Sequence, residues 1–142
     1  MSDAVALAAV REHPLSLDEC STAVGGPTAG AIVTFAGIVR DHDSGRSVVA
    51  LGYEAHPSAE AILRTVAEEI AARHPAVRIA IAHRTGALVV GDLALACAVS
   101  AAHRAEAFAA CSALIDEVKA RVPIWKEQRF ADGSTEWVGS LG

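Results

Sequence analysis

Residues 30–39 read Gly-Ala-Ile-Val-Thr-Phe-Ala-Gly-Ile-Val, and this almost purely apolar stretch decides the fold. Because an edge strand facing water carries polar residues on one side, the run predicts a central strand of a sheet. Gly37 within it indicates a β-bulge or the close approach of another segment. Arg40 ends the strand, in a position that suits either a binding site or a solvent-exposed turn. The polar residues 41–46 predict a turn, after which residues 48–53 are expected to run back as the second arm of a hairpin.

Helices are predicted on both sides of this strand along the chain. The pattern Ser16-Leu17-Asp18-Glu19 is a capping box and predicts a short helix. Aliphatic residues recur at helical spacing after Pro57-Ser58, up to about residue 74, and predict the first long helix. The second long helix is expected from near His103 to Val122, where Pro123 stops it. Its predicted buried face carries Phe108, Cys111, Ile115, Val118 and Val122.

The remaining apolar segments predict strands. They are residues 77–82, 93–99, 124–130 and 135–138, separated by glycine-containing turns such as Asp132-Gly133. Strands outnumber helices and do not alternate with them regularly, which argues against a doubly wound parallel sheet. The sequence therefore predicts an α+β fold in which two main helices pack on a mainly antiparallel sheet in two layers, with a short N-terminal helix. Residues 1–142 are expected to form one domain.

Composition narrows the class of protein. Hydrophobic residues make up 52% of the 142 and charged residues 20%, which suits a compact domain with a proper core. The formal net charge of −5 argues against a general nucleic-acid binder, because phosphate contacts need a clustered basic surface. No apolar run approaches the ~20 residues needed to cross a bilayer, and the N-terminus lacks the order of a secretory signal. A cytoplasmic protein is expected, with any anion site local.

Cysteine and histidine spacing predicts no metal site. Cys20, Cys97 and Cys111 are far apart and none belongs to a Cys-x-x-Cys pair, so neither a disulfide framework nor a zinc site is indicated. Cys97 and Cys111 lie among alanines and aliphatics, where cysteine usually acts as a small core residue. The histidines show no ligand spacing with one another or with cysteine. The sequence therefore assigns no metal and no cofactor.

Lysine is rare in this chain and marks two candidate site positions. The sequence has ten arginines and two lysines, Lys119 and Lys126. Lysine differs from arginine because its amine can lose a proton and act as a nucleophile or general acid/base. Lys126 follows Pro123 by three residues, so we expect it beside Lys119, where two ammonium groups would lower each other's pKa. The alternatives are chance placement and, for Lys119, a cation that complements the helix C-terminus.

His103-Arg104 is a second candidate cluster, at the start of the same helix. Cationic side chains there oppose the helix dipole, and an anionic ligand would reverse that penalty. The alternative is a solvated first turn. At 1.5 Å rise per residue, an unbroken helix separates the Cα atoms of His103 and Lys119 by roughly 24 Å. Either these residues serve different sites, or a symmetric homodimer joins the helix start of one chain to the helix end of the other.

Several short segments together resemble a known family. They are Thr34-Phe-Ala-Gly-Ile-Val-Arg40, Tyr53-Glu54-Ala55, His83-Arg84-Thr85-Gly86, Ser100-Ala-Ala-His-Arg104 with Ala107-Phe108, and Pro123-Ile-Trp-Lys126. In this order and spacing they look like the signature of the large subunits of molybdopterin synthase, over roughly residues 28–138. This resemblance carries the assignment of function; composition and periodicity do not.

The resemblance implies a sulfurtransferase of molybdenum cofactor biosynthesis that converts cyclic pyranopterin monophosphate to molybdopterin. Each sulfur is expected to arrive as the C-terminal Gly-Gly thiocarboxylate of a small ubiquitin-like partner, in a heterotetramer built on a central homodimer. By the same resemblance, Lys119 would assist sulfur transfer and Lys126 would support the reacting centre, with His103 and Arg104 reaching in from the other subunit. The implied substrate contacts are Ile38, Val39, Arg40, His103, Arg104, Lys119, Lys126, Glu127 and Gln128.

The chain departs from the family pattern at particular residues. Gln128 stands where many members have an acidic residue, and Glu127 is the candidate to replace that carboxylate. Gly52 precedes Tyr53 where a larger residue is common. Two other functions stay open: a non-catalytic anion- or nucleotide-binding module that uses the same cationic residues, and a sulfur carrier that uses Cys111. The carrier would need an exposed thiol of lowered pKa.

Overall fold

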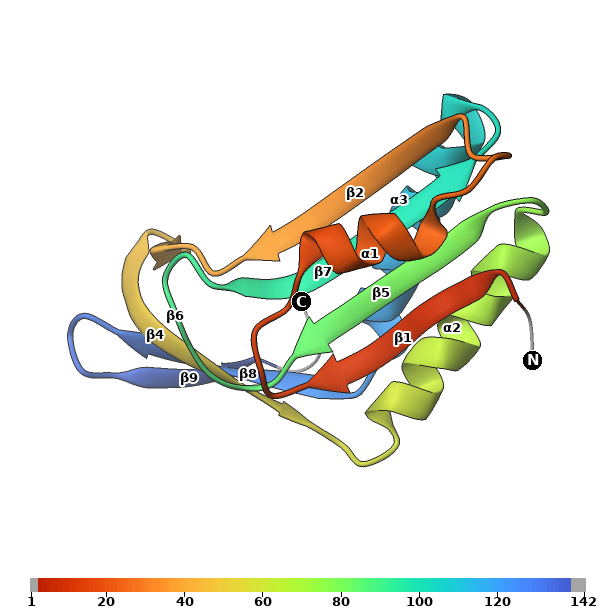
Figure 1. The fold of residues 1–142 in the computed structure, drawn as a ribbon. Helices are drawn as coiled ribbons and strands as arrows, with labels where there is room; N and C mark the ends of the chain where they lie inside the picture. The colour runs from red at the N-terminus through yellow and green to blue at the C-terminus, as the bar shows by residue number, and fades with distance from the viewer. Residues whose placement is uncertain (1–2, 139–142) are drawn as a thin grey trace.

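The computed structural model describes residues 3–138, and Figure 1 shows the arrangement of its elements. Within that range the helices are α1 (Leu17–Val24), α2 (Ala59–Arg73) and α3 (Arg104–Arg121). The strands are β1 (Val5–Arg11), β2 (Ala31–Ile38), β3 (His42–Asp43), β4 (Arg46–Ala55), β5 (Arg78–Arg84), β6 (Gly86–Val89), β7 (Leu93–Ala101), β8 (Ile124–Phe130) and β9 (Thr135–Val138). The predicted α+β class is confirmed.

The first sheet runs in the order β1-β5-β7-β2. β1 pairs with β5 in parallel, whereas the β5/β7 and β7/β2 pairs are antiparallel, so the sheet is mixed. α2 and α3 pack on one face, where Leu63, Ile70 and Leu114 are fully buried. On the other face lies α1, which buries Cys20 and Val24 against the sheet (Figure 1). The predicted two-layer arrangement is therefore wrong at this sheet, which carries helices on both faces.

Alanine explains how a helix as short as α1 covers the second face. Ala80, Ala96 and Ala98 alternate along β5 and β7 with the larger residues that face α2 and α3. The Ser16 hydroxyl caps α1 by accepting a hydrogen bond from the Glu19 backbone N–H at 3.1 Å. Alanine also makes β1 hard to predict. The β1 sequence Val-Ala-Leu-Ala-Ala-Val is rich in alanine, which is a poor strand former, and it lacks alternating polar residues.

β2 is predicted as a central strand, but in this chain it lies at the edge of the first sheet. Its residues alternate between half-buried and exposed, and Ile32 and Ile38 are 44% and 52% exposed. Gly37 is a close-approach point, because a Cβ there would lie 3.2 Å from the Leu95 Cβ, and the β2/β7 register shifts after it. Residues 30–39 are thus more apolar than their partial burial within one chain would require.

The second sheet runs in the order β3-β4-β8-β9, with β6 also paired to β4. The predicted hairpin between residues 30–39 and 48–53 is wrong, because the chain changes sheets after β2 and the segment 48–53 pairs with β8. The hairpin is the short β3/β4 pair, whose turn residues Ser44 and Gly45 both have positive φ, 51° and 76°, as a type I′ turn requires. Apolar alternation tells which residues face a core but not which strand lies alongside, so sequence pattern does not distinguish these pairings.

α3 links the two sheets and packs on the first. Its buried residues are Ala107, Ala110, Cys111, Leu114, Ile115 and Val118. Phe108 is predicted on this face but is 60% exposed, because it lies at the margin of the buried stripe of the helix. Arg121 at the end of α3 pairs with Glu69 of α2 at 2.7 Å. None of the helices in the described range is long and apolar enough to cross a membrane.

Candidate active site

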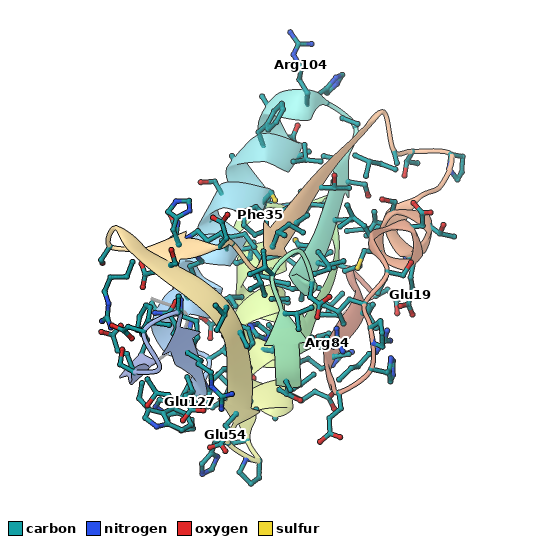
Figure 2. The ribbon with its side chains drawn as sticks, turned by 90° about the vertical axis from the view of Figure 1, so that its left-hand side faces the viewer. Glu19, Phe35, Glu54, Arg84, Arg104 and Glu127 are labelled. Atoms are coloured by element: carbon teal, nitrogen blue, oxygen red, sulfur yellow. The ribbon has the colours of Figure 1, made fainter. Side chains whose placement is uncertain are left out.

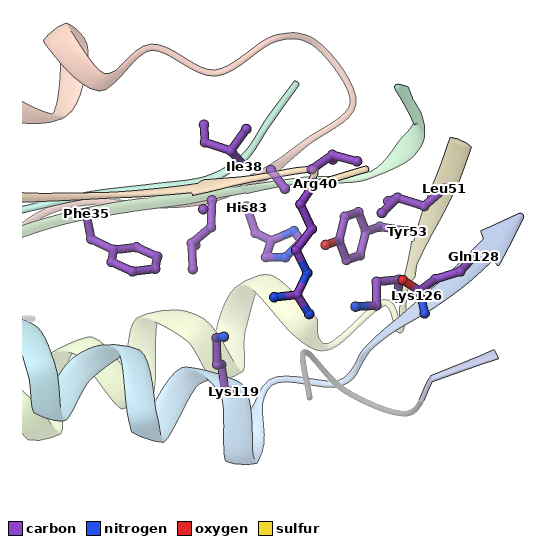
Figure 3. A pocket seen from close by; sticks show the side chains of 13 residues that line it. Phe35, Ile38, Arg40, Leu51, Tyr53, His83, Lys119, Lys126 and Gln128 are labelled. Atoms are coloured by element: carbon purple, nitrogen blue, oxygen red, sulfur yellow. The ribbon is translucent and has the colours of Figure 1, made fainter. Parts of the chain in front are cut away.

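A cavity of about 190 Å³ lies between the first sheet, the end of α3 and the second sheet (Figure 3). Its polar lining residues are Arg40, Tyr53, His83, Lys119, Lys126 and Gln128. Its apolar and glycine lining residues are Phe35, Gly37, Ile38, Val39, Leu51, Ala94 and Leu95. Cationic groups set in an apolar wall suit an anionic organic ligand.

Lys119 and Lys126 line this cavity together. Lys119 belongs to the last turn of α3 and Lys126 to β8, and Figure 3 shows the two side chains entering from these different elements. Burial lowers the pKa of Lys126 because it disfavours the ammonium form. The Asp43 carboxylate opposes this effect, while the charges of Arg40 and Lys119 lower the pKa further. The Lys126 amine therefore gives up its proton more readily than an exposed lysine does.

Arg40 and Gln128 line the same cavity, and both contact Asp43. Arg40 Nη2 donates to Asp43 Oδ1 at 3.3 Å, and Gln128 Nε2 donates to Asp43 Oδ2 at 2.7 Å. The hydrogen bond from Gln128 holds the pKa of Asp43 below its ordinary value, and the charges of Lys126 and Arg40 add to that effect. Asp43 is not recognisable as a site residue in the sequence, because one carboxylate in a polar turn has no diagnostic spacing.

Tyr53 and His83 form a second polar contact in the cavity wall. Their rings meet edge to face, with 4.8 Å between centroids and 82° between planes. His83 Nδ1 lies 2.7 Å from the Arg84 carbonyl oxygen, which can only accept, so Nδ1 carries the proton and donates it. Burial lowers the pKa of His83 to about 4, which keeps the ring neutral at physiological pH. The sequence does not mark these two residues as site residues, because a lone tyrosine or histidine shows no diagnostic spacing.

His103 and Arg104 lie outside the cavity of this chain. His103 is the N-cap of α3 and Arg104 its first residue, and both are exposed. Figure 2 shows Arg104 at the far tip of the helix, away from the second sheet. The helix is continuous from Arg104 to Arg121, so the separation of roughly 24 Å between His103 and Lys119 applies to the folded chain. One small ligand does not touch both ends of α3 in the same chain.

Glu127 also lies outside the cavity. It sits between Lys126 and Gln128 on β8, and because neighbouring strand residues point to opposite faces, it faces away from both. Glu127 is therefore not placed to supply a carboxylate at the position of Gln128. The carboxylate that contacts Gln128 most closely comes from Asp43, on a different strand.

The three cysteines are buried. Cys20, Cys97 and Cys111 are 1%, 0% and 6% exposed. A hydrogen bond between Cys97 and Cys111 raises the pKa of Cys97 and lowers that of Cys111. A thiol as enclosed as Cys111 is poorly placed to exchange sulfur with another protein, which argues against the sulfur carrier. Among residues 3–138, no group of three or more His, Cys, Asp or Glu side chains is placed to hold a metal ion.

Comparison with known proteins identifies relatives of this chain. The family model described as MoaE protein matches residues 10–121. The molybdopterin synthase catalytic subunit 1 of Mycobacterium tuberculosis is 47% identical over 131 residues, which cover 90% of this chain and 87% of that protein. The structure of molybdopterin synthase from Staphylococcus aureus matches with a TM-score of 0.86 at 34% identity, over 92% of this chain and 95% of that chain.

A more distant structure has the same fold. It belongs to a Helicobacter pylori protein–protein complex of subunits 1 and 2 of molybdopterin-converting factor, and matches with a TM-score of 0.71 at 22% identity, over 97% of this chain and 90% of that chain. The length matched by the family model and the identity to the M. tuberculosis protein both exceed what a shared fold alone requires. This chain therefore belongs to the MoaE protein family, whose matched curated members are named molybdopterin synthase catalytic subunits.

Proposed function

We propose that this chain is a sulfurtransferase that converts cyclic pyranopterin monophosphate to molybdopterin at the cavity lined by Lys119 and Lys126. The observation that carries the proposal is that the only two lysines of the sequence, from separate elements, line one cavity together with Arg40. The names of the matched family members support the same reaction. We place this reaction in the cytoplasm, where the sequence predicts the protein to be.

The sulfur donor is a small ubiquitin-like protein whose C-terminal Gly-Gly carries a thiocarboxylate. The two-subunit complex of the H. pylori protein with the same fold is consistent with such a partner. The buried setting of all three cysteines agrees with sulfur that arrives on another protein. The cavity must then admit both the end of an extended tail and the pterin.

Each cationic residue of the cavity has a role that its surroundings support. Arg40 offers a guanidinium fork for the phosphate group of the pterin. Lys119 stabilises negative charge that develops at the terminal carbonyl of the donor tail. Lys126, whose pKa is lowered by burial, gives and takes protons at the reacting centre. Ile38 and Val39 supply apolar surface for the substrate.

A second copy of the chain completes the site. β2 is antiparallel to β7, with Ala31 opposite Ala101 and Ile38 opposite Leu93, so β2 starts near the beginning of α3 and ends at the cavity. Antiparallel pairing of two β2 edges would therefore bring the α3 start of one chain to the cavity of the other. In that arrangement His103 and Arg104 of the second copy reach the substrate.

The exposed edge of β2 has the properties that this pairing needs. An edge strand presents unpaired backbone N–H and C=O groups to a partner strand. Ile32 on β2 is 44% exposed, and Phe108, which lines a groove with β2 residues Val33 and Phe35, is 60% exposed. A homodimer that covers these side chains accounts for the central-strand character of residues 30–39.

The proposed reaction is tested by turnover of the cyclic pterin with purified protein and a thiocarboxylated small subunit. Wild type is expected to form the dithiolene product, and Lys119→Ala is expected to lose nearly all of it while keeping its fold and oligomeric state. Glu127→Gln, on the opposite face of β8, is the matched control and should keep wild-type turnover. Absence of product from wild type with a verified partner would instead favour an anion-binding module that uses Arg40, Lys119 and Lys126 without turnover.

Composite sites are tested by mixing two impaired variants at substrate concentrations well below KM, where both rates are low. When Lys119→Ala and Arg104→Ala chains exchange subunits, half of the dimers are mixed, and each mixed dimer keeps one intact site. About a quarter of the wild-type rate should therefore return. If each site lies within one chain, the rate of the mixture stays at the average of the rates of its two components.

A further inference from the structure

The β3/β4 hairpin brings a carboxylate into contact with two residues that line the cavity, Arg40 and Gln128. Asp43 ends β3, and the type I′ turn at Ser44-Gly45 returns the chain to Arg46, which pairs with Asp43. Gly45 at φ 76° is the position where this turn disfavours a side chain. Because the hairpin is short, the turn fixes where the Asp43 carboxylate stands relative to β8.

Gln128 holds that carboxylate from the cavity side. Its side chain is 3% exposed, and its Nε2 donates to Asp43 Oδ2 at 2.7 Å and to Glu136 Oε1 at 3.4 Å. Ionised carboxylates only accept hydrogen bonds, so the amide nitrogen of Gln128 must face them. A neutral amide at position 128 thus satisfies two anions at once, which a third carboxylate in the same place would repel.

Asp43 lies among the cationic groups of the cavity. Its second oxygen, Oδ1, accepts from Arg40 Nη2 at 3.3 Å, and Arg40 extends into the cavity between the first sheet and α3 (Figure 3). The charged groups that act on Lys126 are Asp43, Arg40, Lys119 and Glu136. Of the two anions, Asp43 has the larger effect on the pKa of Lys126. Its negative charge opposes the repulsion that Arg40 and Lys119 exert on the Lys126 ammonium.

We infer that Asp43 is a positioning residue of this site: held by Gln128, it directs the Arg40 guanidinium toward the substrate phosphate and balances the positive charge around Lys126. The inference rests on the proposed function, because it assigns Asp43 a role at the same reacting centre. Asp43 does not touch the reacting atoms. It acts through Arg40 and Lys126, and the charge of its carboxylate is what the site uses.

Exchanging the carboxylate of Asp43 and the amide of Gln128 distinguishes the effect of the Asp43 charge from the effect of the hydrogen bond between the two side chains. Asp43→Asn keeps an oxygen that accepts from Gln128 but removes the charge, and kcat/KM is expected to fall about tenfold. Gln128→Glu sets a new carboxylate against Asp43 and Glu136, and a comparable loss is expected. The double variant Asp43→Asn with Gln128→Glu again has one amide and one carboxylate beside Lys126, and should recover to within about threefold of wild type.

Asp41→Asn is the matched control, since Asp41 is an exposed carboxylate of the same loop whose side chain pairs with His42. It should leave kcat/KM unchanged.

A second measurement does not depend on turnover. Because the sequence has only two lysines, protein labelled with ¹³C at lysine Cε gives one side-chain signal for each, and Lys119→Arg assigns them.

Titration of the Lys126 signal reports the charge of Asp43 directly. Asp43→Asn removes a negative neighbour, so the titration midpoint of Lys126 should move down, whereas Asp41→Asn should not move it. The double variant should move it back. A wild-type midpoint and wild-type kcat/KM in Asp43→Asn would overturn the inference, as would an exchange that restores neither. If wild type itself forms no product, the proposed function fails, and the lysine titration still decides whether Asp43 acts on Lys126.

Discussion

The two ends of α3 carry cationic residues in opposite surroundings. At the C-terminal end, Lys119 lines a cavity that it shares with Lys126 and Arg40. At the N-terminal end, His103 and Arg104 are exposed, and neither lines the cavity of its own chain. The helix dipole favours cations at the first of these ends and disfavours them at the second.

This difference agrees with the proposal that one chain holds only part of a site. Lys119 is a cation at the C-terminal end of α3, where the helix dipole favours positive charge. Its position is therefore favourable even when no ligand occupies the cavity. His103 and Arg104 stand where positive charge is unfavourable until an anion arrives. The proposed dimer resolves the contrast, because it joins the unfavourable end of one helix to the cavity at the favourable end of another.

The largest expected effect is at the cavity end. Lys119→Ala should lower kcat by about 10²–10⁴-fold, the range typical of a positioned acid/base or charge-stabilising group, with a smaller change in KM. Lys119→Arg keeps the cation and should recover only part of the loss, since the planar guanidinium places its charge and its donors differently from the compact lysine ammonium. Single-turnover kinetics with the thiocarboxylated partner measure both. A kcat for Lys119→Ala near that of wild type would remove this residue from the mechanism.

His83, which lines the cavity, should also make the free energy of unfolding depend on pH. The pKa of His83 is about 4 in the folded chain against an ordinary value of 6.5, so the unfolded state binds more protons between these values. The neutral ring contributes fully above pH 6.5, and about 3 kcal/mol is lost as pH falls through 4.

Denaturant unfolding at pH 7 and pH 4 measures this loss. His83→Gln should show a smaller difference between the two pH values than wild type. His103→Gln changes an exposed histidine at the other end of α3 and serves as the control, which should keep the wild-type difference. Equal differences in wild type and His83→Gln would contradict the assigned neutral state of His83.

A smaller effect is expected at the exposed end. Arg104→Ala should reduce kcat/KM by about tenfold to a hundredfold, mainly through a higher KM for the phosphate-bearing substrate, because a charge-assisted contact to an anion is lost. Arg129→Ala removes an exposed arginine from the face of β8 that points away from the cavity and should have no such effect. An unchanged KM in Arg104→Ala would argue that the helix start serves no substrate.

The smallest expected effect concerns the folding of the single chain. Phe108→Ser should change the free energy of unfolding of the monomer by no more than about 0.5 kcal/mol, because the ring is 60% exposed. The same variant should weaken self-association, which sedimentation at several protein concentrations measures. A large loss of monomer stability with an unaltered dimer would place Phe108 in the core and break the proposed interface.

Local signals explain what could be predicted about the fold. Ser16 caps α1, Pro123 follows the end of α3, and β8 and β9 have the predicted bounds. Capping, helix termination and strand periodicity depend on neighbours along the chain, so they can be read without the fold. Strand partners depend on distant segments, which is why the position of β2 and the hairpin assignment were wrong.

The same division applies to the site. Lys119, Lys126 and Arg40 stand out in the sequence because lysine is rare and because Arg40 ends an apolar strand. Asp43 and His83 do not stand out, since their chemistry comes from contacts with Gln128 and Arg84 and from burial.

The sequence by itself determined the helices and most strands, the α+β class and the family resemblance, because local periodicity and ordered short segments are properties of the chain alone. Only the tertiary structure decided that β2 lies at an edge, that Glu127 faces away from the cavity and that Asp43 faces the residues lining it. These features depend on which strands pair and in which register, and a shift of one residue reverses the face to which every side chain of a strand points.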